Sequence, residues 1–542
     1  MNNHVRRWKY EDLIDKDLKD EIILMESNPD LALDAFSMDL EFGTGGLRGI
    51  LGAGTNRMNV YTVRRASFAF AKTLKKGSKI AIAYDSRIKS DLFAKEAARV
   101  FANMGIFVYL YNQVSPTPLL SYTVRHLNCD GGIVITASHN PSEYNGYKVY
   151  DNEGCQIGPK KAEEILDEIK NIDVFYKHGD ELSFEQCLEF GYITYIGQNI
   201  IDSFLKVVTN EVFLKEERTL KLVYTPLHGS GYECVSQGFD LCGFKNVQYV
   251  KEQIKPDGNF PTAKYPNPEV KEALILGIRD LEASCSDILI ATDPDCDRAA
   301  VAVLHKDEVK ILNGNEIGIL LLDYICHIRS ELGILPQNPL AIKTIVTTEL
   351  AKSICKKYGV QLIEVLTGFK FIGEQIAILE ENGREKDFIF AFEESCGYLS
   401  GTYVRDKDAV NASLLIADMA DYYKKKGMSL YDKLEKIYKE HGYLFTYLGN
   451  YEYKGLEGLD KMKSIMKNLR ASSLLTKDYL NNTDHLKADV LEFNIEDKGI
   501  AIVRPSGTEP KIKVYYSSQA KDSLKSKSKL SELVTYFEKM IE

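Results

Sequence analysis

The sequence has no long run of uncharged apolar residues. Its most apolar stretch, residues 317–326, already contains Asp323 and is far shorter than the roughly 18 apolar residues that a membrane-spanning helix needs. The first twelve residues lead into more charge rather than into the apolar segment of a secretory signal, so we expect no such signal. These two absences predict a cytoplasmic protein without a membrane span.

Several motifs of common protein classes are also missing. The 10 cysteines form no CxxC pair and no cysteine/histidine zinc spacing, which predicts reduced, structural thiols. No GxxxxGK[ST] loop occurs, and the glycine-rich segment 42–49 has Arg48 where a dinucleotide fingerprint needs its third glycine. No Gly-x-Ser-x-Gly elbow argues for a hydrolase. ATP and NAD sites are therefore not indicated.

The composition is that of a globular protein of several domains. The chain has 542 residues, of which 44% are apolar and 27% charged, close to globular averages. At about 150 residues per domain, this length predicts three to four domains. The formal net charge of −10 disfavours a general attraction to nucleic acid or to an anionic membrane.

Four short apolar runs end in unusual polar loops. Each run reads as a buried strand, and the strands alternate with longer helical patterns, which is typical of α/β domains. Ligands bind beyond the carboxyl ends of such strands, so these loops are the candidate functional segments. They lie at residues 136–141, 292–298, 393–397 and 504–508. Their spacing, near one domain length each, predicts one loop per domain.

The second of these loops contains three aspartates, Asp293, Asp295 and Asp297. Three carboxylates this close repel one another unless a cation or a set of donors compensates them, and hard oxygen ligands suit Mg²⁺. An EF-hand does not fit, because Arg298 stands at the glycine position and Leu304 at the position of the bidentate glutamate. The alternative is a solvated acidic turn.

The first loop carries Ser138, followed by His139 and Asn140. Asn140 can cap a short helix that begins at Pro141, and the free backbone N–H groups of such an end suit an anionic group. A phosphate on Ser138 fits this arrangement. An ordinary turn would show the same residues, so the spacing by itself leaves both interpretations open.

The last two loops suit a sugar phosphate. A guanidinium, two hydroxyls and an open glycine backbone, which suit a dianionic phosphate, occur together at Arg504, Ser506, Gly507 and Thr508. Glu393 and Ser395 offer an acceptor and a hydroxyl to sugar hydroxyls. A surface arginine and an acidic loop are the respective alternatives.

Taken together in this order, the four loops resemble those of the α-D-phosphohexomutase superfamily over nearly the whole chain. Five further segments resemble the branch that holds bacterial phosphoglucomutases and animal phosphoglucomutase-2/phosphopentomutase enzymes. These segments are residues 43–48, 56–58, 224–229, 256–261 and 367–370.

This resemblance implies three similar α/β domains with mixed, mostly parallel sheets and a smaller C-terminal α+β domain around a central cleft. The expected boundaries are 1–205 with the phosphoserine loop, 206–308 with the metal loop, 309–435 with the sugar loop and 436–542 with the phosphate loop.

The resemblance also implies the chemistry. Ser138 would carry a phosphoryl group and ligate one Mg²⁺ together with the three aspartates, while Arg298 offsets negative charge. A sugar phosphate would take the phosphoryl group to form a bisphosphate, glucose 1,6-bisphosphate for a glucose substrate, which turns over and returns its other phosphate. Lys148 matches a basic position of the family, with His139 and Arg48 nearby, and it would need a lowered pKa to act as a base.

The sugar loop departs from the bacterial phosphomannomutase/phosphoglucomutase pattern, because Gly397 stands where a histidine is expected. Lys407 matches a lysine of other phosphoglucomutases and is expected to transfer a proton or contact the sugar phosphate. The predicted activity is a Mg²⁺-dependent phosphoglucomutase in the cytoplasm, a monomer or weak homodimer. The alternatives are a phosphopentomutase, a phosphomannomutase, a glucose 1,6-bisphosphate synthase or a catalytically silent binding phosphoprotein.

Overall fold

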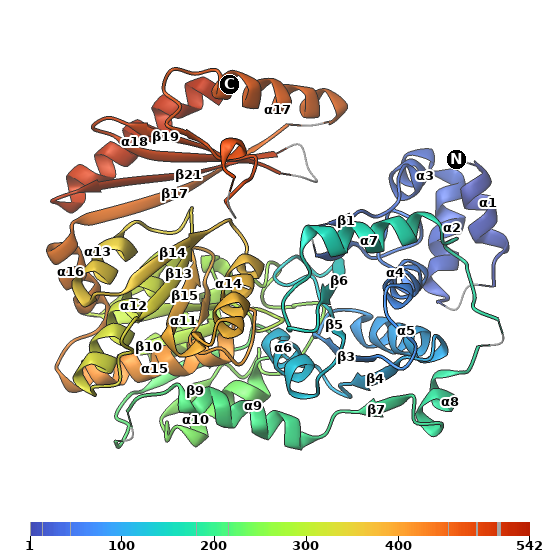
Figure 1. Ribbon diagram of the computed structural model, residues 1–542, viewed down its shortest axis with the longest axis horizontal. Helices are drawn as coiled ribbons and strands as arrows, with labels where there is room; N and C mark the ends of the chain where they lie inside the picture. The colour runs from blue at the N-terminus through green and yellow to red at the C-terminus, as the bar shows by residue number, and fades with distance from the viewer. Residues whose placement is uncertain are drawn as a thin grey trace. The chain divides into compact units, whose positions relative to one another are not determined.

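The computed structural model describes residues 2–12, 15–43, 45–179, 181–214, 216–453, 455–483, 486–506 and 511–541 (Figure 1). The chain forms two compact units. The first comprises Met1–Leu312, Gly373–Glu385 and Gly397–Tyr422, and the second comprises Asn313–Ile372, Lys386–Cys396 and Tyr423–Glu542.

The first unit begins with three helices, α1 (Asn2–Tyr10), α2 (Asp17–Ser27) and α3 (Pro29–Phe36). They pack on the following domain through Trp8, the only tryptophan of the chain, which is 1% exposed. Its ring lies 5.8 Å from Phe36, 5.5 Å from Tyr61 and 5.0 Å from Phe175, all edge to face. This aromatic cluster ties the N-terminal helices to the first sheet's core.

The first sheet has the strand order β1-β2-β6-β5-β3-β4-β7. Strands β5, β3, β4 and β7 are parallel, whereas β6, β2 and β1 continue the sheet in antiparallel pairs. The strand bounds are β1 Phe42–Gly43, β2 Gly46–Ile50, β3 Lys79–Tyr84, β4 Phe107–Leu110, β5 Gly131–Ile135, β6 Tyr144–Tyr150 and β7 Ile193–Tyr195. The sheet is therefore mixed.

Helices cover both faces of this sheet (Figure 1). A Cβ at Gly131 of β5 would lie 2.9 Å from Phe70 of α4 (Val60–Lys72), and one at Gly132 would lie 2.6 Å from Val124 of α6 (Thr117–His126). Successive strand residues point to opposite faces, so α4 and α6 cover opposite faces. Helices α5 (Ser90–Asn103) and α7 (Pro159–Lys170) pack against α4, and α8 (Phe184–Glu189) packs against α5.

The second sheet of this unit has the order β12-β11-β10-β8-β9 and is also mixed. Strands β8, β9 and β10 are parallel, and β11 and β12 are antiparallel to their neighbours. The strand bounds are β8 Leu222–Thr225, β9 Val247–Tyr249, β10 Ile288–Thr292, β11 Ala299–His305 and β12 Glu308–Leu312.

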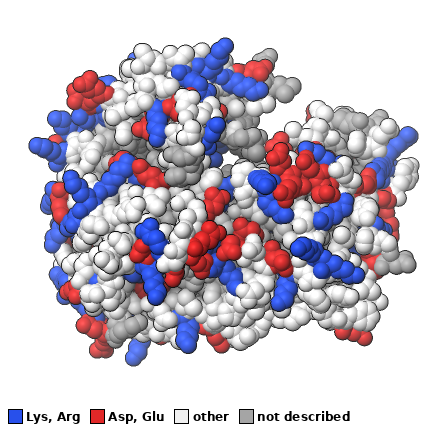
Figure 2. Space-filling view, in the orientation of Figure 1, with Lys and Arg blue, Asp and Glu red and all other residues white. Residues whose placement is uncertain are grey.

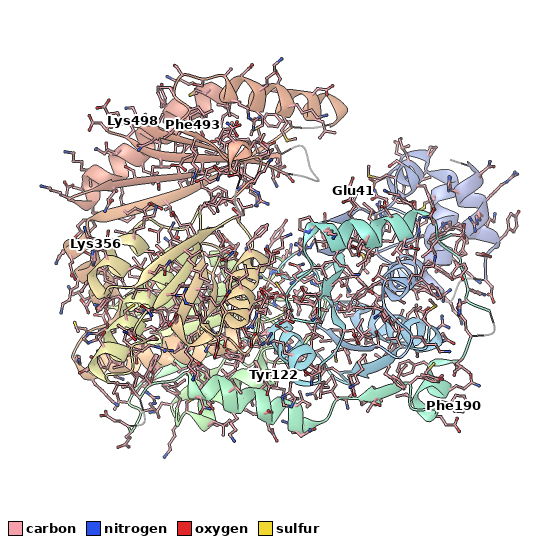
Figure 3. All side chains as sticks on the ribbon, in the orientation of Figure 1. Glu41, Tyr122, Phe190, Lys356, Phe493 and Lys498 are labelled. Atoms are coloured by element: carbon pink, nitrogen blue, oxygen red, sulfur yellow. The ribbon has the colours of Figure 1, made fainter. Side chains whose placement is uncertain are left out.

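Close packing places the helices around the second sheet. Gly277 of α11 (Ile275–Ala283) lets that helix approach Leu289 of β10, and Gly238 of α10 (Tyr232–Leu241) faces Leu414 of α15 (Ala409–Lys425). Helix α9 (Gln198–Asn210) contacts α6, and the hydroxyl of Tyr122, labelled in Figure 3, lies 2.6 Å from Ser203 Oγ. The two sheets thus share packed helices within one unit.

The second unit contains a parallel arrangement in the order β14-β13-β15 and a separate antiparallel sheet. Its first part comprises α12 Gly314–Glu331, β13 Leu340–Thr344, α13 Leu350–Tyr358, β14 Gln361–Val365, β15 Phe388–Glu393 and α16 Leu430–His441. Helix α14 (Phe369–Glu381) begins in this unit and ends in the first one. Helix α12 packs on β15, where Gly318 leaves room for the ring of Phe392.

The C-terminal sheet has the order β17-β21-β20-β19-β18 and is antiparallel throughout. Its elements are β17 Tyr443–Glu452, α17 Gly455–Arg470, β18 Lys477–Asp478, β19 Leu491–Ile495, β20 Gly499–Pro505, β21 Lys511–Ala520 and α18 Ser523–Ile541. Phe493, labelled in Figure 3, packs edge to face on Phe537 of α18 at 5.0 Å. Three α/β regions and one α+β region confirm the predicted fold class.

Candidate functional site

Ser138 lies just beyond β5 in a strained backbone position. Its φ is +54°, a left-handed conformation that is uncommon for residues other than glycine and that often marks functional loops. The Thr136 hydroxyl accepts a hydrogen bond from the Ser138 N–H at 2.8 Å. The Ser138 hydroxyl, 3% exposed as a residue, donates to Asp293 Oδ2 at 3.0 Å and lies 3.2 Å from His139 Nδ1. The serine is held with its oxygen toward the metal loop.

The three aspartates of the metal loop form one buried cluster. Asp293, Asp295 and Asp297 are each at most 1% exposed, and one ligand atom from each lies within 4.8 Å of the others. Asp293 Oδ1 accepts the N–H groups of Asp297 at 3.0 Å and Arg298 at 2.9 Å, which curls the loop around it. The Oδ1 atoms of Asp295 and Asp297 accept no hydrogen bond from the described residues.

Buried carboxylate oxygens that accept no hydrogen bond are costly unless a cation compensates them. An all-oxygen set of three carboxylates with a serine oxygen beside it fits a hard divalent cation such as Mg²⁺. The residues present therefore fit the metal that the sequence led us to expect at this place.

Two lysines already direct their ammonium groups at the cluster. Lys148 of β6 donates to Asp295 Oδ2 at 2.7 Å and lies 3.4 Å from Asp297 Oδ2. Lys407 lies 3.0 Å from Asp297 Oδ2 and 3.4 Å from Asp406 Oδ1. Both lysines are candidate site residues from the sequence, and the structure brings both to the acidic loop.

The acidic and basic groups shift one another's pKa values. Burial, followed by the charges of Asp297 and Asp295, raises the pKa of Asp293 well above its usual value. Burial also opposes ionisation of Asp295, but the ion pair with Lys148 outweighs it and holds the pKa of Asp295 below its usual range. Burial lowers the pKa of Lys148, but the negative charges of Asp295 and Asp297 outweigh the effect of burial, so the pKa of Lys148 is raised overall. The lowered pKa expected for a basic Lys148 is thus not found.

Three other candidate residues surround the serine and metal loops. Burial, followed by the charges of Arg298 and Arg48, lowers the pKa of His139 well below its usual value and so favours the uncharged imidazole. Arg48, exposed on β2, donates to Asn140 Oδ1 at 3.2 Å. Arg298 pairs with Glu269 at 2.8 Å and has its Nε 3.9 Å from Asp297 Oδ1. All three therefore lie around the same two loops.

Residues 393–396 of the sugar loop and the described part of the phosphate loop belong to the second unit. Glu393 is the last residue of β15 and is 5% exposed. Ser395, two residues further along the chain, is half-buried. Arg504 lies exposed on β20, where its side chain hydrogen-bonds Tyr515 of β21. Ser506 donates its backbone N–H to Lys511 O at 2.7 Å. Gly507 and Thr508 lie outside the described residues.

Two residues that hold the site, Arg87 and Thr117, were not predicted from the sequence. Arg87 is 3% exposed and donates to backbone carbonyls of the serine loop, including Ser138 O at 2.6 Å. Thr117, at the start of α6, donates its hydroxyl to Asp295 Oδ2 at 3.0 Å. A signal for Arg87 was available, because β3 is also a buried strand followed by polar residues, Asp-Ser-Arg at 85–87.

A serine oxygen beside a buried, oxygen-only carboxylate centre, on a scaffold of several α/β domains, is typical of enzymes that transfer phosphoryl groups with a divalent metal. Four successive family domains match the chain. They are described as phosphoglucomutase/phosphomannomutase alpha/beta/alpha domains I, II and III and the C-terminal domain, at residues 39–175, 201–306, 313–441 and 416–527. The chain belongs to the phosphoglucomutase/phosphomannomutase family.

Individual relatives agree with this assignment. Phosphoglucomutases from strains of Staphylococcus aureus are 36% identical over 517 residues, covering 90% of this chain and 91% of theirs. A solved structure of a family protein from Burkholderia thailandensis has a TM-score of 0.69 at 18% identity, covering 92% of this chain and 96% of its own. The Paramecium phosphoprotein parafusin, in its open form, has a TM-score of 0.67 at 17% identity, covering 93% and 94%. The two structures support the fold.

The surface and helices add two observations. No helix among the described residues is both long and apolar enough to cross a membrane. Figure 2 shows lysine and arginine side chains intermingled with aspartate and glutamate over the visible face of the described residues.

Proposed function

We propose that this chain is a Mg²⁺-dependent phosphoglucomutase that interconverts α-D-glucose 1-phosphate and glucose 6-phosphate through a phosphoserine and glucose 1,6-bisphosphate. One observation carries the proposal: the Ser138 hydroxyl lies 3.0 Å from Asp293, in a buried aspartate cluster with two carboxylate oxygens that accept no hydrogen bond. The kinship with phosphoglucomutases over 90% of the chain supports the choice of reaction.

The candidate site residues of the first unit each have a role in this proposal. Asp293, Asp295 and Asp297 hold one Mg²⁺, which when bound would neutralise charge on the phosphoryl group that Ser138 carries. Arg298 and Arg48 lie beside the loops and add positive charge where that group would sit. The hydroxyl of the sugar phosphate attacks the phosphorus while the bond to Ser138 Oγ breaks, so the serine oxygen is the leaving group.

A basic group must take the proton of the attacking hydroxyl. His139 Nδ1 lies 3.2 Å from the serine oxygen, next to the position of the transferred group. Lys148 and Lys407 are ion-paired with the carboxylates, and a metal on those carboxylates would compete with them. The proposal assigns proton transfer to this trio of basic residues.

The second unit supplies the substrate contacts in this proposal. Arg504, Ser506, Gly507 and Thr508 hold the distal phosphate, and Glu393 and Ser395 pair with hydroxyls of the sugar ring. Since the bisphosphate must react from either end, the same loops serve both orientations. Glucose selectivity then lies with Glu393, because a missing or inverted hydroxyl removes its hydrogen bond to the sugar ring.

A coupled mutase assay tests this function. Wild type and Ser138→Ala are compared with glucose, mannose, ribose and deoxyribose 1-phosphates, each with and without the matching bisphosphate. We expect glucose 1-phosphate to have the highest kcat/KM in wild type and Ser138→Ala to be inactive. A higher kcat/KM with a pentose or mannose phosphate would identify that sugar phosphate as the substrate. Formation of the bisphosphate only when an acyl phosphate is supplied would identify the chain as a synthase. Inactivity on every donor would leave a binding phosphoprotein.

We also place the enzyme in the cytoplasm, as a monomer or weak homodimer. All ten cysteines are free thiols in the structure, and nine of them are buried or half-buried, which suits a reducing compartment.

A further inference from the structure

Arg87 is a buried arginine that holds the serine loop by its backbone. Its Nη2 donates to Ser138 O at 2.6 Å and to Asn140 O, and its Nη1 donates to Pro141 O at 2.8 Å and Tyr144 O at 3.0 Å. Four carbonyl groups within residues 138–144 therefore converge on one guanidinium. The planar fork of arginine suits this set, whereas a lysine has only three donors on one nitrogen.

A second set of contacts holds the guanidinium itself. Arg87 Nε lies 3.4 Å from Asp85 Oδ2, and both side chains are fully buried. The same Asp85 oxygen accepts the Thr136 hydroxyl at 2.6 Å, and that hydroxyl oxygen in turn accepts the Ser138 N–H. Arg87 and Asp85 thus hold Ser138 from its carbonyl side and its N–H side at once.

A loop from the second sheet closes over this arginine. The Phe260 ring lies 5.1 Å from the Arg87 guanidinium carbon, within the range of a cation–π contact. A Cβ at Gly258 would lie 2.4 Å from Ile88 N and 2.7 Å from Ser86 O, so this loop packs on the backbone around Arg87 without space for a side chain. Gly258 and Phe260, the two buried residues of this segment, therefore pack against the residue that anchors the serine loop.

We propose that Arg87 is the positioning residue that sets the Ser138 oxygen against the aspartate cluster, and that Phe260 holds the Arg87 guanidinium in place for this. The role rests on the proposed function, since it concerns the transfer of a phosphoryl group to and from Ser138. Arg87 makes no hydrogen bond to Asp293, Asp295 or Asp297, and the proposed substrate contacts do not include it. Its effect is therefore on the geometry of Ser138.

The chain offers a closely matched control, Arg218. This arginine is 8% exposed, donates to Cys242 O, Leu214 O and Asp418 Oδ1, and lies 4.5 Å from the Phe244 ring. It has the same kinds of partner as Arg87 but none in the serine or metal loops. Loss of a buried arginine's contacts can therefore be separated from loss of serine positioning.

The test compares Arg87→Lys with Arg218→Lys in the full chain. We expect both to lower the melting temperature similarly, while only Arg87→Lys slows phosphorylation of Ser138 by glucose 1,6-bisphosphate, on the order of a hundredfold. Its KM for glucose 1-phosphate should stay within about twofold, because the proposed substrate contacts are unchanged. Equal slowing in both variants, or a normal rate in Arg87→Lys, would overturn the proposal.

If Arg87→Lys does not fold, the same comparison is made with Phe260→Leu and Phe244→Leu, which remove only the ring over each guanidinium. Slowing confined to Phe260→Leu supports the proposal, and equal rates refute it. If wild type itself shows no phosphorylation at Ser138, the proposed function fails, and positioning is then judged by amide hydrogen exchange. Faster exchange at residues 136–145 only in the Arg87 or Phe260 variant would still support the anchor, and unchanged exchange would refute it.

Discussion

At the scale of single residues, the aspartate cluster gives the sharpest expectation. Asp295→Asn removes one negative charge and one of the two carboxylate oxygens that accept no hydrogen bond. Loss of an outer contact to a metal ligand commonly costs 10–100-fold in affinity, so loss of a ligand charge should weaken Mg²⁺ binding at least on that order. Calorimetric titration of purified protein with MgCl₂ measures this. Unchanged affinity would place the metal elsewhere.

The phosphate loop gives a second expectation at this scale. Arg504 is exposed on β20, where its guanidinium can meet an anionic ligand with charge-assisted hydrogen bonds, each worth about 1.5–3 kcal/mol. Arg504→Ala should therefore raise the KM for glucose 1-phosphate on the order of ten- to a hundredfold. Phosphorylation of Ser138 by a small phosphoryl donor should persist. An unchanged KM would show that the distal phosphate binds at another place.

At the scale of elements, helix α15 carries a buried titratable cap. Asp408 accepts the N–H groups of Val410 at 2.8 Å and Asn411 at 3.0 Å, and the Tyr403 hydroxyl at 2.9 Å. Burial raises the pKa of Asp408 to about 6, against 3.8 for the ordinary group. Between these two pH values the folded chain binds more protons than the unfolded one, so stability falls as pH rises through this window.

Asp408→Asn removes this dependence, because an amide does not ionise and can still accept the two N–H groups. The free energy of unfolding of the variant, relative to wild type, should rise by about 2.4 kcal/mol between pH 4 and pH 7. Urea unfolding followed by Trp8 emission at both pH values measures the difference. A difference that does not change with pH would mean that Asp408 titrates normally.

The elements also show what the sequence could predict. Strands β5 and β10 were predicted from buried apolar runs that end in polar loops, and the structure brings Ser138 and Asp293 from those loops to 3.0 Å. The polar residues after β3 could have marked Arg87 as a candidate, but not its role, because its partners are backbone carbonyls that are brought together only in the folded loop after β5. The ion pairs that raise the pKa of Lys148 were also not predicted, because they join β6 to a loop of another sheet, 147 residues further along the chain.

At the scale of the whole molecule, the single tryptophan distinguishes the two units. Trp8 is buried against Phe36, Tyr61 and Phe175, all in the first unit, whereas the core around Phe493 and Phe537 belongs to the second. Chains of several domains commonly unfold in more than one step. Trp8 emission should therefore follow a urea transition that does not coincide with far-ultraviolet circular dichroism. Coincident transitions would show that the units unfold together.

The account's central claim is that the phosphate of the product comes from Ser138 and not from the same sugar molecule. The direct measurement uses a mixture of two glucose 1-phosphates, one labelled with ¹⁸O in the phosphate and the other with ¹³C in the sugar. Mass spectrometry of the glucose 6-phosphate formed then reports whether the labels stay together. We predict that product carrying both labels and product carrying neither appear alongside the original pairings, that Ser138→Ala forms no product, and that phosphate maps to the Ser138 peptide. Labels that remain with their original partners in every product molecule, or a phosphate on another residue, would contradict the account.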